Sequence, residues 1–222
     1  MKAMILAAGR GERLRPLTDL TPKPLLKAGQ YRLIEYLIQS LVKAGITEIV
    51  INHAHLGEQF EPTLGDGSQF GAEITYSAEQ QGGLETAGGI IKALPLLGNA
   101  PFLLVNGDIW TDFPFEQLVN RHLQANILCH LVLVNNPEHN LHGDFSLTSG
   151  QVNQQGSQKL TYSGIGIYQP SLFKDYEVQR LALKPILVDA IDKQQITGQH
   201  YQGDWSDIGT VERLRHLTDK LA

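Results

Sequence analysis

The N-terminal stretch of this sequence reads Met1-Lys2-Ala3-Met4-Ile5-Leu6-Ala7-Ala8-Gly9-Arg10-Gly11-Glu12-Arg13-Leu14-Arg15-Pro16, and Thr21-Pro22-Lys23-Pro24 follows shortly after. Its uncharged run, residues 3–8, is typical of a strand buried on both faces of a parallel sheet. The glycines that follow provide flexible backbone, and three arginines and a lysine add cations nearby. A buried strand that ends in such a loop predicts a site for a phosphate-rich ligand.

Strand-like and helix-like segments alternate over residues 1–134. We expect Gly45 to cap the first long helix and Pro95 to end or bend a later one. Alternation of this kind implies crossover connections, so the sequence predicts an α/β fold with a mainly parallel sheet flanked by helices. Apolar runs predict strands at 46–51, 73–77, 102–105 and 127–134, and helical spacing predicts helices at 33–42, 56–64, 86–97 and 115–124.

The pattern changes after Asn135. Residues 135–170 are rich in Asn, Gln, Gly and Ser, and they contain two expected strands, at 143–147 and 160–168. This composition indicates a small antiparallel insert at one end of the sheet. Helices are expected at 178–194 and 210–221, and no repeat or linker interrupts the chain, so we expect a single domain.

The composition excludes several classes of protein. With 222 residues and 42% hydrophobic content, the chain can bury one sizeable core. Its net charge of −5 argues against a nucleic-acid partner, so the cations are expected to serve a small anionic ligand. No run approaches the roughly 18 apolar residues of a membrane helix, and no signal peptide is recognisable, so we expect a cytoplasmic protein without a membrane partner. The oligomeric state stays open, a monomer included.

Two familiar nucleotide-binding motifs do not fit the loop at residues 9–13. The P-loop pattern of Gly, four residues and Gly-Lys-Ser/Thr is absent. The dinucleotide fingerprint would need a third glycine where Leu14 stands, and an acid where the second strand ends in Asn52-His53. Hydride transfer is therefore disfavoured. A plain strand-to-helix turn with surface arginines is the alternative, but it leaves the Thr-Pro-Lys-Pro segment unexplained.

Lys23 and Asp108 are the strongest candidates for chemistry. Lys23 lies between two prolines, whose fixed φ angles hold the lysine on stiff backbone suited to a preorganised phosphate contact. Asp108 follows a buried strand and Asn106-Gly107, at the sheet edge where open α/β folds bind ligands. A carboxylate that faces phosphates suggests Mg²⁺, which prefers oxygen ligands. An Asx turn that closes the strand is the alternative for Asp108.

Two further motifs are more ambiguous. Asp207 lies in Trp205-Ser206-Asp207-Ile208-Gly209-Thr210 and is either a second metal carboxylate or part of a helix cap. The glycine-rich segment 82–89 offers backbone amides to a base or sugar, or forms a flexible turn before a closely packed helix.

Taken together and in order, these motifs resemble the sugar-1-phosphate nucleotidyltransferase family. The resemblance implies a Rossmann-like α/β core and transfer of a nucleotidyl group from a nucleoside triphosphate to a sugar 1-phosphate, releasing pyrophosphate. The segments that carry it are Leu6 to Thr18, Thr21 to Leu25, Asn106-Gly107-Asp108 and residues 205–210.

A closer resemblance is to the uridylyltransferases that act on N-acetylmuramate 1-phosphate in peptidoglycan recycling. Ile51-Asn52-His53-Ala54, Leu84-Glu85-Thr86, residues 92–98 and residues 102–112 carry it. It implies UTP and a sugar 1-phosphate as substrates. It also implies a nucleotide half at about 1–134 and a sugar-binding part at about 135–222 within one domain, 1–222.

The resemblance also implies roles for individual residues. Arg13 and Lys23 are expected to be catalytic, and Asp108 and Asp207 to hold Mg²⁺. The expected nucleotide-binding residues are Leu6, Ala8, Gly9, Gly11, Glu12, Arg13, Lys23, Glu79, Gly82 and Gly83, and the expected sugar-binding residues are Asn106, Asp144 and Gly164.

The sequence departs from the family in two places. Where many relatives have Pro-Leu-Gly-Thr, this chain has Gly83-Leu84-Glu85-Thr86. The Glu-Lys-Pro segment of many hexose relatives is missing, and Tyr162-Ser163-Gly164 stands in that region. Another sugar 1-phosphate (glucose, mannose or N-acetylglucosamine), another nucleotide, or a non-catalytic sensor on the same fold are the alternatives.

Overall fold

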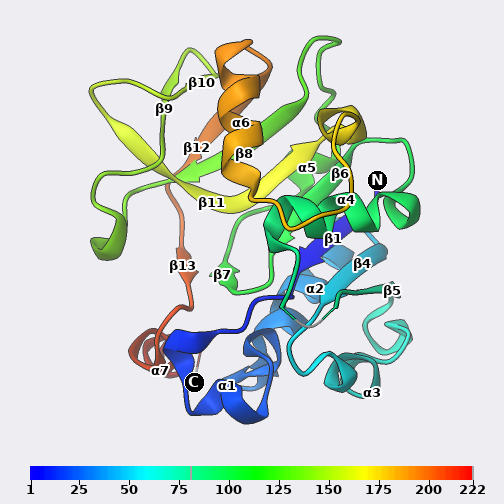
Figure 1. The fold of residues 1–222 in the computed structure, drawn as a ribbon. Helices are drawn as coiled ribbons and strands as arrows, with labels where there is room; N and C mark the ends of the chain where they lie inside the picture. The colour runs from blue at the N-terminus through cyan, green and yellow to red at the C-terminus, as the bar shows by residue number, and fades with distance from the viewer. Residues whose placement is uncertain (81, 222) are drawn as a thin grey trace.

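A nine-stranded mixed sheet forms the centre of the protein, whose computed structural model describes residues 1–80 and 82–221 (Figure 1). Its strand order is β5-β4-β1-β6-β11-β8-β12-β10-β9. The parallel part consists of β5 (Glu73–Ala78), β4 (Glu48–His53), β1 (Ala3–Leu6) and β6 (Phe102–Asn106). The expected mainly parallel α/β core is therefore confirmed.

The second half of the sheet is where the antiparallel pairs lie. The long strand β11 (Lys159–Tyr168) runs antiparallel between β6 and β8 (Cys129–Val134), and β12 (Ile196–Tyr201) runs parallel to β8. Of the two strands expected in the insert, the one at 143–147 is β9 (Phe145–Thr148) at the end of the sheet. The one at 160–168 is β11, which lies in the middle of the sheet and not at its end, because it pairs with both β6 and β8. A third strand, β10 (Gln151–Asn153), pairs with β9 and was not predicted. Because β9 also pairs with the start of β11, the strands β11, β8, β12, β10 and β9 form a closed ring of pairings at this end of the sheet.

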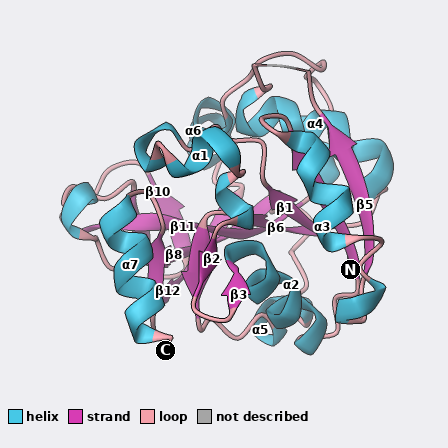
Figure 2. Cartoon of the chain, turned by 90° about the horizontal axis from the view of Figure 1, so that it is seen from below, coloured by secondary structure: helices cyan, strands magenta, loops and turns pink. Residues whose placement is uncertain are grey.

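Helices cover both faces of the sheet, because successive side chains of a buried strand point to opposite sides. On β1, Ala3 and Ile5 face the core beneath α2 (Leu33–Lys43), whereas Met4 faces the core beneath α4 (Glu85–Leu97) and α6 (Leu183–Asp192). Figure 2 shows α4 and α6 on one side of the sheet and α2 with α5 (Glu116–Val119) on the other. None of the helices in the described part of the chain has the length and apolar character needed to cross a bilayer.

A third apolar cluster joins the two ends of the chain. Leu214 and Leu217 of α7 (Val211–Lys220) pack with Leu14, Leu26 and other buried residues of the segment 14–33. In this segment lie α1 (Leu17–Leu20) and the two-residue strands β2 (Lys27–Ala28) and β3 (Tyr31–Arg32), which pair with each other. Two other short strands, β7 (Ile109–Thr111) and β13 (Trp205–Asp207), also pair and bring the C-terminal motif to the end of β6.

Most predicted elements are present, and three helix predictions need correction. The helix at 33–42 ends as expected, with Gly45 in the left-handed region at φ 84°. The segment 56–64 forms a 3₁₀ turn and α3 (Phe60–Leu64), as predicted. Pro95 does not end α4, which continues to Leu97 because Leu97 is buried in the core.

The other two corrections concern helices that are shorter than predicted. Within 115–124 only Glu116–Val119 is helical, since beyond it only Leu123 packs against the core. Within 178–194 the helix begins at Leu183, because the backbone of Leu181 is bonded to the first turn of α4: its N–H donates to Leu84 O, and its carbonyl accepts from Ala87 N.

The buried His130 makes the stability of the fold depend on pH. Its ring nitrogens lie 2.8 Å from Thr197 Oγ1 and 3.1 Å from Gln199 Oε1. Burial, helped by the charge of Arg121, lowers the pKa of His130 to about 4. A histidine in the unfolded chain titrates near pH 6.5, so unfolding takes up a proton below that pH. This contribution to stability is complete above about pH 6.5 and is lost as the pH falls toward 4.

We therefore expect His130→Asn to flatten the pH dependence of stability. Between pH 7 and pH 5 the parent protein should lose on the order of 1–2 kcal/mol more unfolding free energy than the variant, because only the parent has this histidine to protonate. Urea titrations at both pH values measure the difference. Equal losses in the two proteins would contradict the assignment.

Candidate active site

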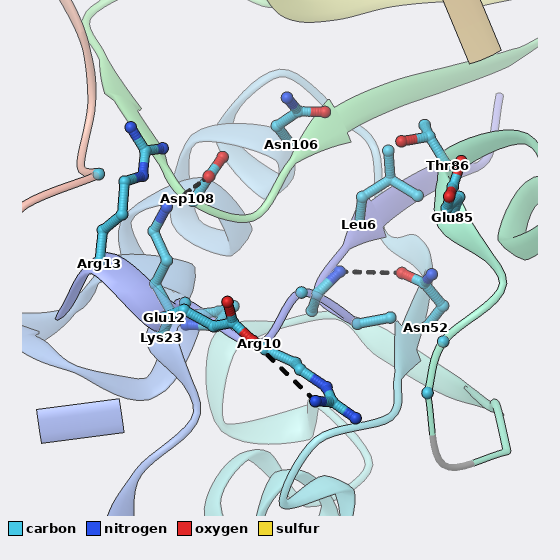
Figure 3. Close-up of a pocket in the computed structure, with 18 of the residues that line it drawn as sticks. Leu6, Arg10, Glu12, Arg13, Lys23, Asn52, Glu85, Thr86, Asn106 and Asp108 are labelled. Atoms are coloured by element: carbon cyan, nitrogen blue, oxygen red, sulfur yellow. Dashed lines mark hydrogen bonds and ion pairs between the residues drawn. The ribbon is translucent and has the colours of Figure 1, made fainter. Parts of the chain in front are cut away.

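A cleft of about 770 Å³ opens at the carboxyl ends of the parallel strands, as expected for an open α/β sheet (Figure 3). The ends of β1, β4 and β6, the glycine-rich loop after β1 and the start of α4 form its walls. The lining residues are Leu6, Ala7, Ala8, Gly9, Arg10, Gly11, Glu12, Arg13, Lys23, Pro24, Asn52, Gly82, Gly83, Glu85, Thr86, Asn106, Asp108, Arg180 and Gly209.

The loop after β1 is held in one shape by its own backbone. Gly11 adopts φ 63°, in the left-handed region that glycine tolerates best, and its carbonyl accepts from Leu14 N at 2.8 Å and from Thr18 Oγ1 at 2.9 Å. Thr18 is buried, and its own carbonyl lies 2.8 Å from the ring of His55. The loop therefore presents a fixed curve of backbone to the cleft.

Lys23 and Asp108 meet at the floor of the cleft. Their Nζ and Oδ2 atoms are 2.5 Å apart, although the residues are separated by 85 positions in the sequence (Figure 3). The lysine is only 7% exposed, whereas the aspartate side chain is 36% exposed. Burying an ammonium is costly unless it is paired, so this contact fixes Lys23 against the end of β6 while one face of Asp108 stays open to the cleft.

Arg13 reaches across to the C-terminal motif. A Cβ placed on Gly209 would lie 3.0 Å from the Arg13 guanidinium and 2.7 Å from that of Arg213, so both cations lie directly against this glycine. Gly209 follows β13, whose residue Asp207 pairs in register with Ile109 of β7. The arginine of the N-terminal loop and the aspartate of the C-terminal motif are thereby brought to the same end of the cleft.

Asp207 does not line the cleft directly. Its Oδ1 accepts from Arg213 at 2.5 Å and lies 2.9 Å from Nε2 of His139. Among the residues described, its second oxygen, Oδ2, has no hydrogen-bond partner. The Ile208 N–H donates to the Asp108 carbonyl at 2.7 Å, which ties the backbone of the two aspartates together.

The predicted site residues mostly gather in this cleft. Leu6, Ala8, Gly9, Gly11, Glu12, Arg13, Lys23, Gly82, Gly83, Asn106 and Asp108 all line it. Among the predicted residues, Glu79, Asp144, Gly164 and Asp207 do not. Gly164 supports the site from behind, because a Cβ there would lie 2.6 Å from the Asn106 side chain.

Asp144 braces the antiparallel insert. Its Oδ2 accepts from Tyr162 N at 3.0 Å and from Asn140 Nδ2 at 3.3 Å. The nearby Trp205 donates through Nε1 to the Ser163 carbonyl at 2.9 Å, which fastens the C-terminal motif to β11. These bonds hold the insert and the C-terminal motif to β11, outside the residues that line the cleft.

Several lining residues were not predicted from the sequence. Asn52 carried a usable signal, because a polar side chain at the end of a buried parallel strand faces the ligand edge of the sheet. Arg180 carried none, since it lies in a loop where a helix was expected. Its guanidinium pairs with Glu85 at 3.0 Å, and Glu85 adopts φ 58°, a strained value for a residue other than glycine.

The two histidines after β4 differ in their roles. His53 stacks on Phe60 with ring centroids 5.5 Å apart, and burial lowers the pKa of its imidazole. It is therefore a neutral packing residue behind the site. His55 lines a smaller pocket of about 430 Å³ that shares Ala8, Arg10, Gly82 and Gly83 with the main cleft.

A sequence model of the family described as nucleotidyl transferase matches residues 2–222. The chain belongs to this family. It is 53% identical over 221 residues to the N-acetylmuramate alpha-1-phosphate uridylyltransferase of Neisseria meningitidis serogroup B, a match that covers 97% of this chain and 96% of that protein. The predicted family, and with it an enzyme of the nucleotidyltransferase class, is confirmed.

More distant members of the family share the core. Mannose-1-phosphate guanyltransferase beta-A of Xenopus laevis is 29% identical over 94% of this chain, which spans 61% of that longer protein. A Bacillus anthracis structure assigned as a glucose-1-phosphate thymidylyltransferase, in complex with sucrose, superposes with a TM-score of 0.86 at 23% identity and covers 100% of this chain and 95% of its own. This structural likeness confirms the fold of the family.

The two glycines of the loop after β1 should differ sharply in their tolerance of a side chain. A Cβ on Gly11 would lie 2.9 Å from Thr18 and 3.0 Å from Lys23 Cβ, whereas Gly9 has nothing within 4 Å. Gly11→Ala should therefore cost about 1–3 kcal/mol of stability and displace Lys23. Gly9→Ala is the matched control and should stay within about 0.5 kcal/mol of the parent. Thermal melts of both variants measure the contrast, and equal melting temperatures would contradict it.

Proposed function

We propose that the protein transfers UMP from UTP to N-acetylmuramate 1-phosphate, forming UDP-N-acetylmuramate and pyrophosphate. The observation that carries this proposal is the Lys23–Asp108 pair. It joins a buried ammonium group to a partly exposed carboxylate beside a glycine-rich loop. The choice of UTP and of this sugar rests on the Neisseria relative. The reaction belongs to peptidoglycan recycling, and its triphosphate substrate suits a cytoplasmic enzyme.

The reaction needs no nucleophile from the protein. A phosphate oxygen of the sugar 1-phosphate attacks the α-phosphorus of UTP in line, the bond to the β-phosphate oxygen breaks, and pyrophosphate leaves. Catalysis of such a step is mostly positioning and electrostatic stabilisation. The cleft supplies the cations Arg10, Arg13, Lys23 and Arg180 for this purpose.

Individual residues of the cleft divide this work. Backbone groups of the segment 6–12, from Leu6 and Ala8 through Gly9 and Gly11 to Glu12, would cradle the triphosphate. Arg13 would neutralise the departing pyrophosphate, while Lys23 would lie against the α-phosphate and the incoming phosphate. Glu79, Gly82 and Gly83 would form the uracil side.

The sugar would lie toward β6 and β11. The Asn106 side chain points into the cleft from the end of β6, as Figure 3 shows, and Gly164 leaves room for it. Asp144 would support the sugar side from β11, through its bond to Tyr162 N.

The acidic residues suit Mg²⁺ in part. The Asp108 carboxylate is partly exposed to the cleft. Asp207 lies on β13, which pairs with β7, and its Oδ2 has no hydrogen-bond partner among the described residues. Both residues therefore offer the hard oxygen ligands that Mg²⁺ prefers. No three His, Cys, Asp or Glu side chains in the described ranges form a ready-made metal site. This agrees with a magnesium ion held by one or two carboxylates together with substrate phosphates. When bound, Mg²⁺ would offset the repulsion between the two anionic reactants.

A screen of substrates tests the reaction. Purified protein is crossed with UTP, CTP, GTP, ATP and dTTP, and with the 1-phosphates of N-acetylmuramate, N-acetylglucosamine, glucose and mannose, and pyrophosphate release is measured. We expect the highest kcat/KM for UTP with N-acetylmuramate 1-phosphate. A higher value for another pair would transfer the proposal to that pair, and no release with any pair would favour a sensor.

Asp108 and Lys23 should both be needed for turnover. Asp108→Asn and Lys23→Met are each expected to lower kcat by on the order of 10² or more, because each removes a charge beside the reacting phosphates. Circular dichroism and thermal melts determine the folded fraction. Activity that simply tracks the folded fraction would assign the pair to structure instead of catalysis.

A further inference from the structure

A chain of hydrogen bonds at the edge of the cleft connects the loops that follow β1 and β5 through the end of β4. Asn52, the penultimate residue of β4, is 2% exposed, and its Oδ1 accepts from the Ala7 N–H at 2.9 Å (Figure 3). Its Nδ2 donates to Glu79 Oε1 at 2.6 Å. The other oxygen of Glu79 accepts from the Leu84 N–H at 2.7 Å. One amide at the end of β4 and one carboxylate thus link the loops that follow β1 and β5.

The direction of every bond in this chain is fixed. The two backbone N–H groups at its ends can only donate, and an ionised carboxylate can only accept. Asn52 must therefore turn its oxygen toward Ala7 and its NH₂ toward Glu79. Both carboxylate oxygens of Glu79 already receive protein donors, which gives this residue a structural task beyond any contact with a base.

Helix α4 closes over the pair. A Cβ on Gly89 would lie 2.5 Å from Glu79 Oε1 and 2.7 Å from Asn52 Nδ2. Only glycine lets this buried turn of the helix approach so closely. The pair is confined between β4 and α4, so any change in its length or polarity must be transmitted to the ends of the chain, at Ala7 and Leu84.

The two ends of the chain belong to loop segments that lie close together and both line the cleft. Ala7 and Ala8 follow β1, Gly82 and Gly83 precede Leu84, and a Cβ placed on Gly83 would lie 3.9 Å from the Ala8 carbonyl. Lys23 and Asp108, by contrast, belong to other elements and make no bond to this chain among the residues described. The position of the two loop segments relative to each other is therefore set by Asn52 and Glu79, independently of the cations at the phosphate end.

We propose that Asn52 is a positioning residue for the nucleotide, which acts through Glu79 to hold the two loop segments at the base-binding end of the cleft in a fixed relative position. This inference rests on the proposed function, since it assigns that end of the cleft to the uracil of UTP. Loss of the linkage should weaken nucleotide binding while leaving the chemical step nearly intact. KM for UTP should rise and kcat should change little.

A polarity swap tests the proposal. In Asn52→Asp two carboxylates face each other, and in Glu79→Gln an NH₂ group must face either Asn52 Nδ2 or the Leu84 N–H. In the double variant Asn52→Asp/Glu79→Gln every bond can form again. The introduced carboxylate accepts from the Ala7 N–H and from the introduced amide, and the oxygen of that amide accepts from the Leu84 N–H. The swap keeps the connectivity and moves the negative charge from position 79 to position 52.

We expect each single variant to raise KM for UTP about tenfold, with kcat within about threefold of the parent. The double variant should return KM to within about threefold, which double-mutant analysis reads as coupling between the two positions. A double variant as impaired as Glu79→Gln would overturn the proposal, because the charge at position 79 would then be what the nucleotide needs.

Two more variants separate positioning from general damage. Gly89→Ala inserts a methyl group between Asn52 and Glu79 without altering a polar group, and it should reproduce the rise in KM. Val50→Ala is the matched control, since Val50 is as buried as Asn52 and lies on the same face of β4 as Asn52. It should lower the melting temperature and leave KM unchanged. A rise in KM with Val50→Ala, or none with Gly89→Ala, would contradict the positioning role.

Amide hydrogen exchange provides a readout that does not depend on catalysis. The Ala7 and Leu84 amides should exchange slowly in the parent and in the double variant, and at least about tenfold faster in both single variants. If the protein does not turn over UTP while exchange follows this pattern, the proposed function fails and the linkage stands. If turnover of UTP is normal and exchange does not change, the linkage fails and the function stands.

Discussion

The ion pair between Lys23 and Asp108 is the contact on which the rest of the site depends. The ammonium group lies almost entirely out of water, and a buried charge without a partner costs roughly 3–5 kcal/mol. Its partner stands at the end of β6, so the segment after the glycine-rich loop can occupy only one place along the sheet edge. Gly11 contributes to the same constraint, because its missing side chain leaves room for the stem of Lys23.

The C-terminal segment stabilises the position of the N-terminal loop. Leu214 and Leu217 pack against Leu14 and Leu26, so the last helix holds the N-terminal loop from outside. The strand pair β7–β13 then brings Asp207 beside Asp108. The end of the cleft where Gly209 lies beside Arg13 therefore forms only when the two ends of the chain have met, which ties the assembly of the site to the completion of the fold.

Long segments with a clear apolar pattern were predicted well from the sequence, whereas very short strands and helix boundaries were not. The buried strands and α2 have clear apolar periodicity, and β1, β4 and β6 lie where the sequence placed them. Strands β7 and β13 contain three residues each and have no periodic signal, so pairing across nearly a hundred residues decides them. The helix expected from residue 178 begins later because Leu181 gives its backbone bonds to α4, a contact that local sequence cannot reveal.

The site was predictable from the sequence where its functional residues lie at or just after the ends of buried strands. Lys23, Asp108 and the glycine-rich loop stand out by residue type and by position, and they line one cleft. Glu79 and Asp207 were also singled out, but the sequence could not show that Asn52 and Arg213 bind their carboxylates, because such partners are set by three-dimensional proximity.

The return of strand pairing from β9 to β11 also restricts how this protein can meet other chains. A strand at the border of a sheet normally exposes a row of backbone groups to which a foreign strand can add. On the insert side, within the described part of the sheet, backbone groups of β9 pair with the start of β11. On the other side β5 forms the border, and the Ile74 N–H is already bonded to the Asp66 carbonyl at 2.7 Å. Strand addition is thus hindered at the insert border, and at the β5 border a foreign strand would have to pair without the Ile74 N–H.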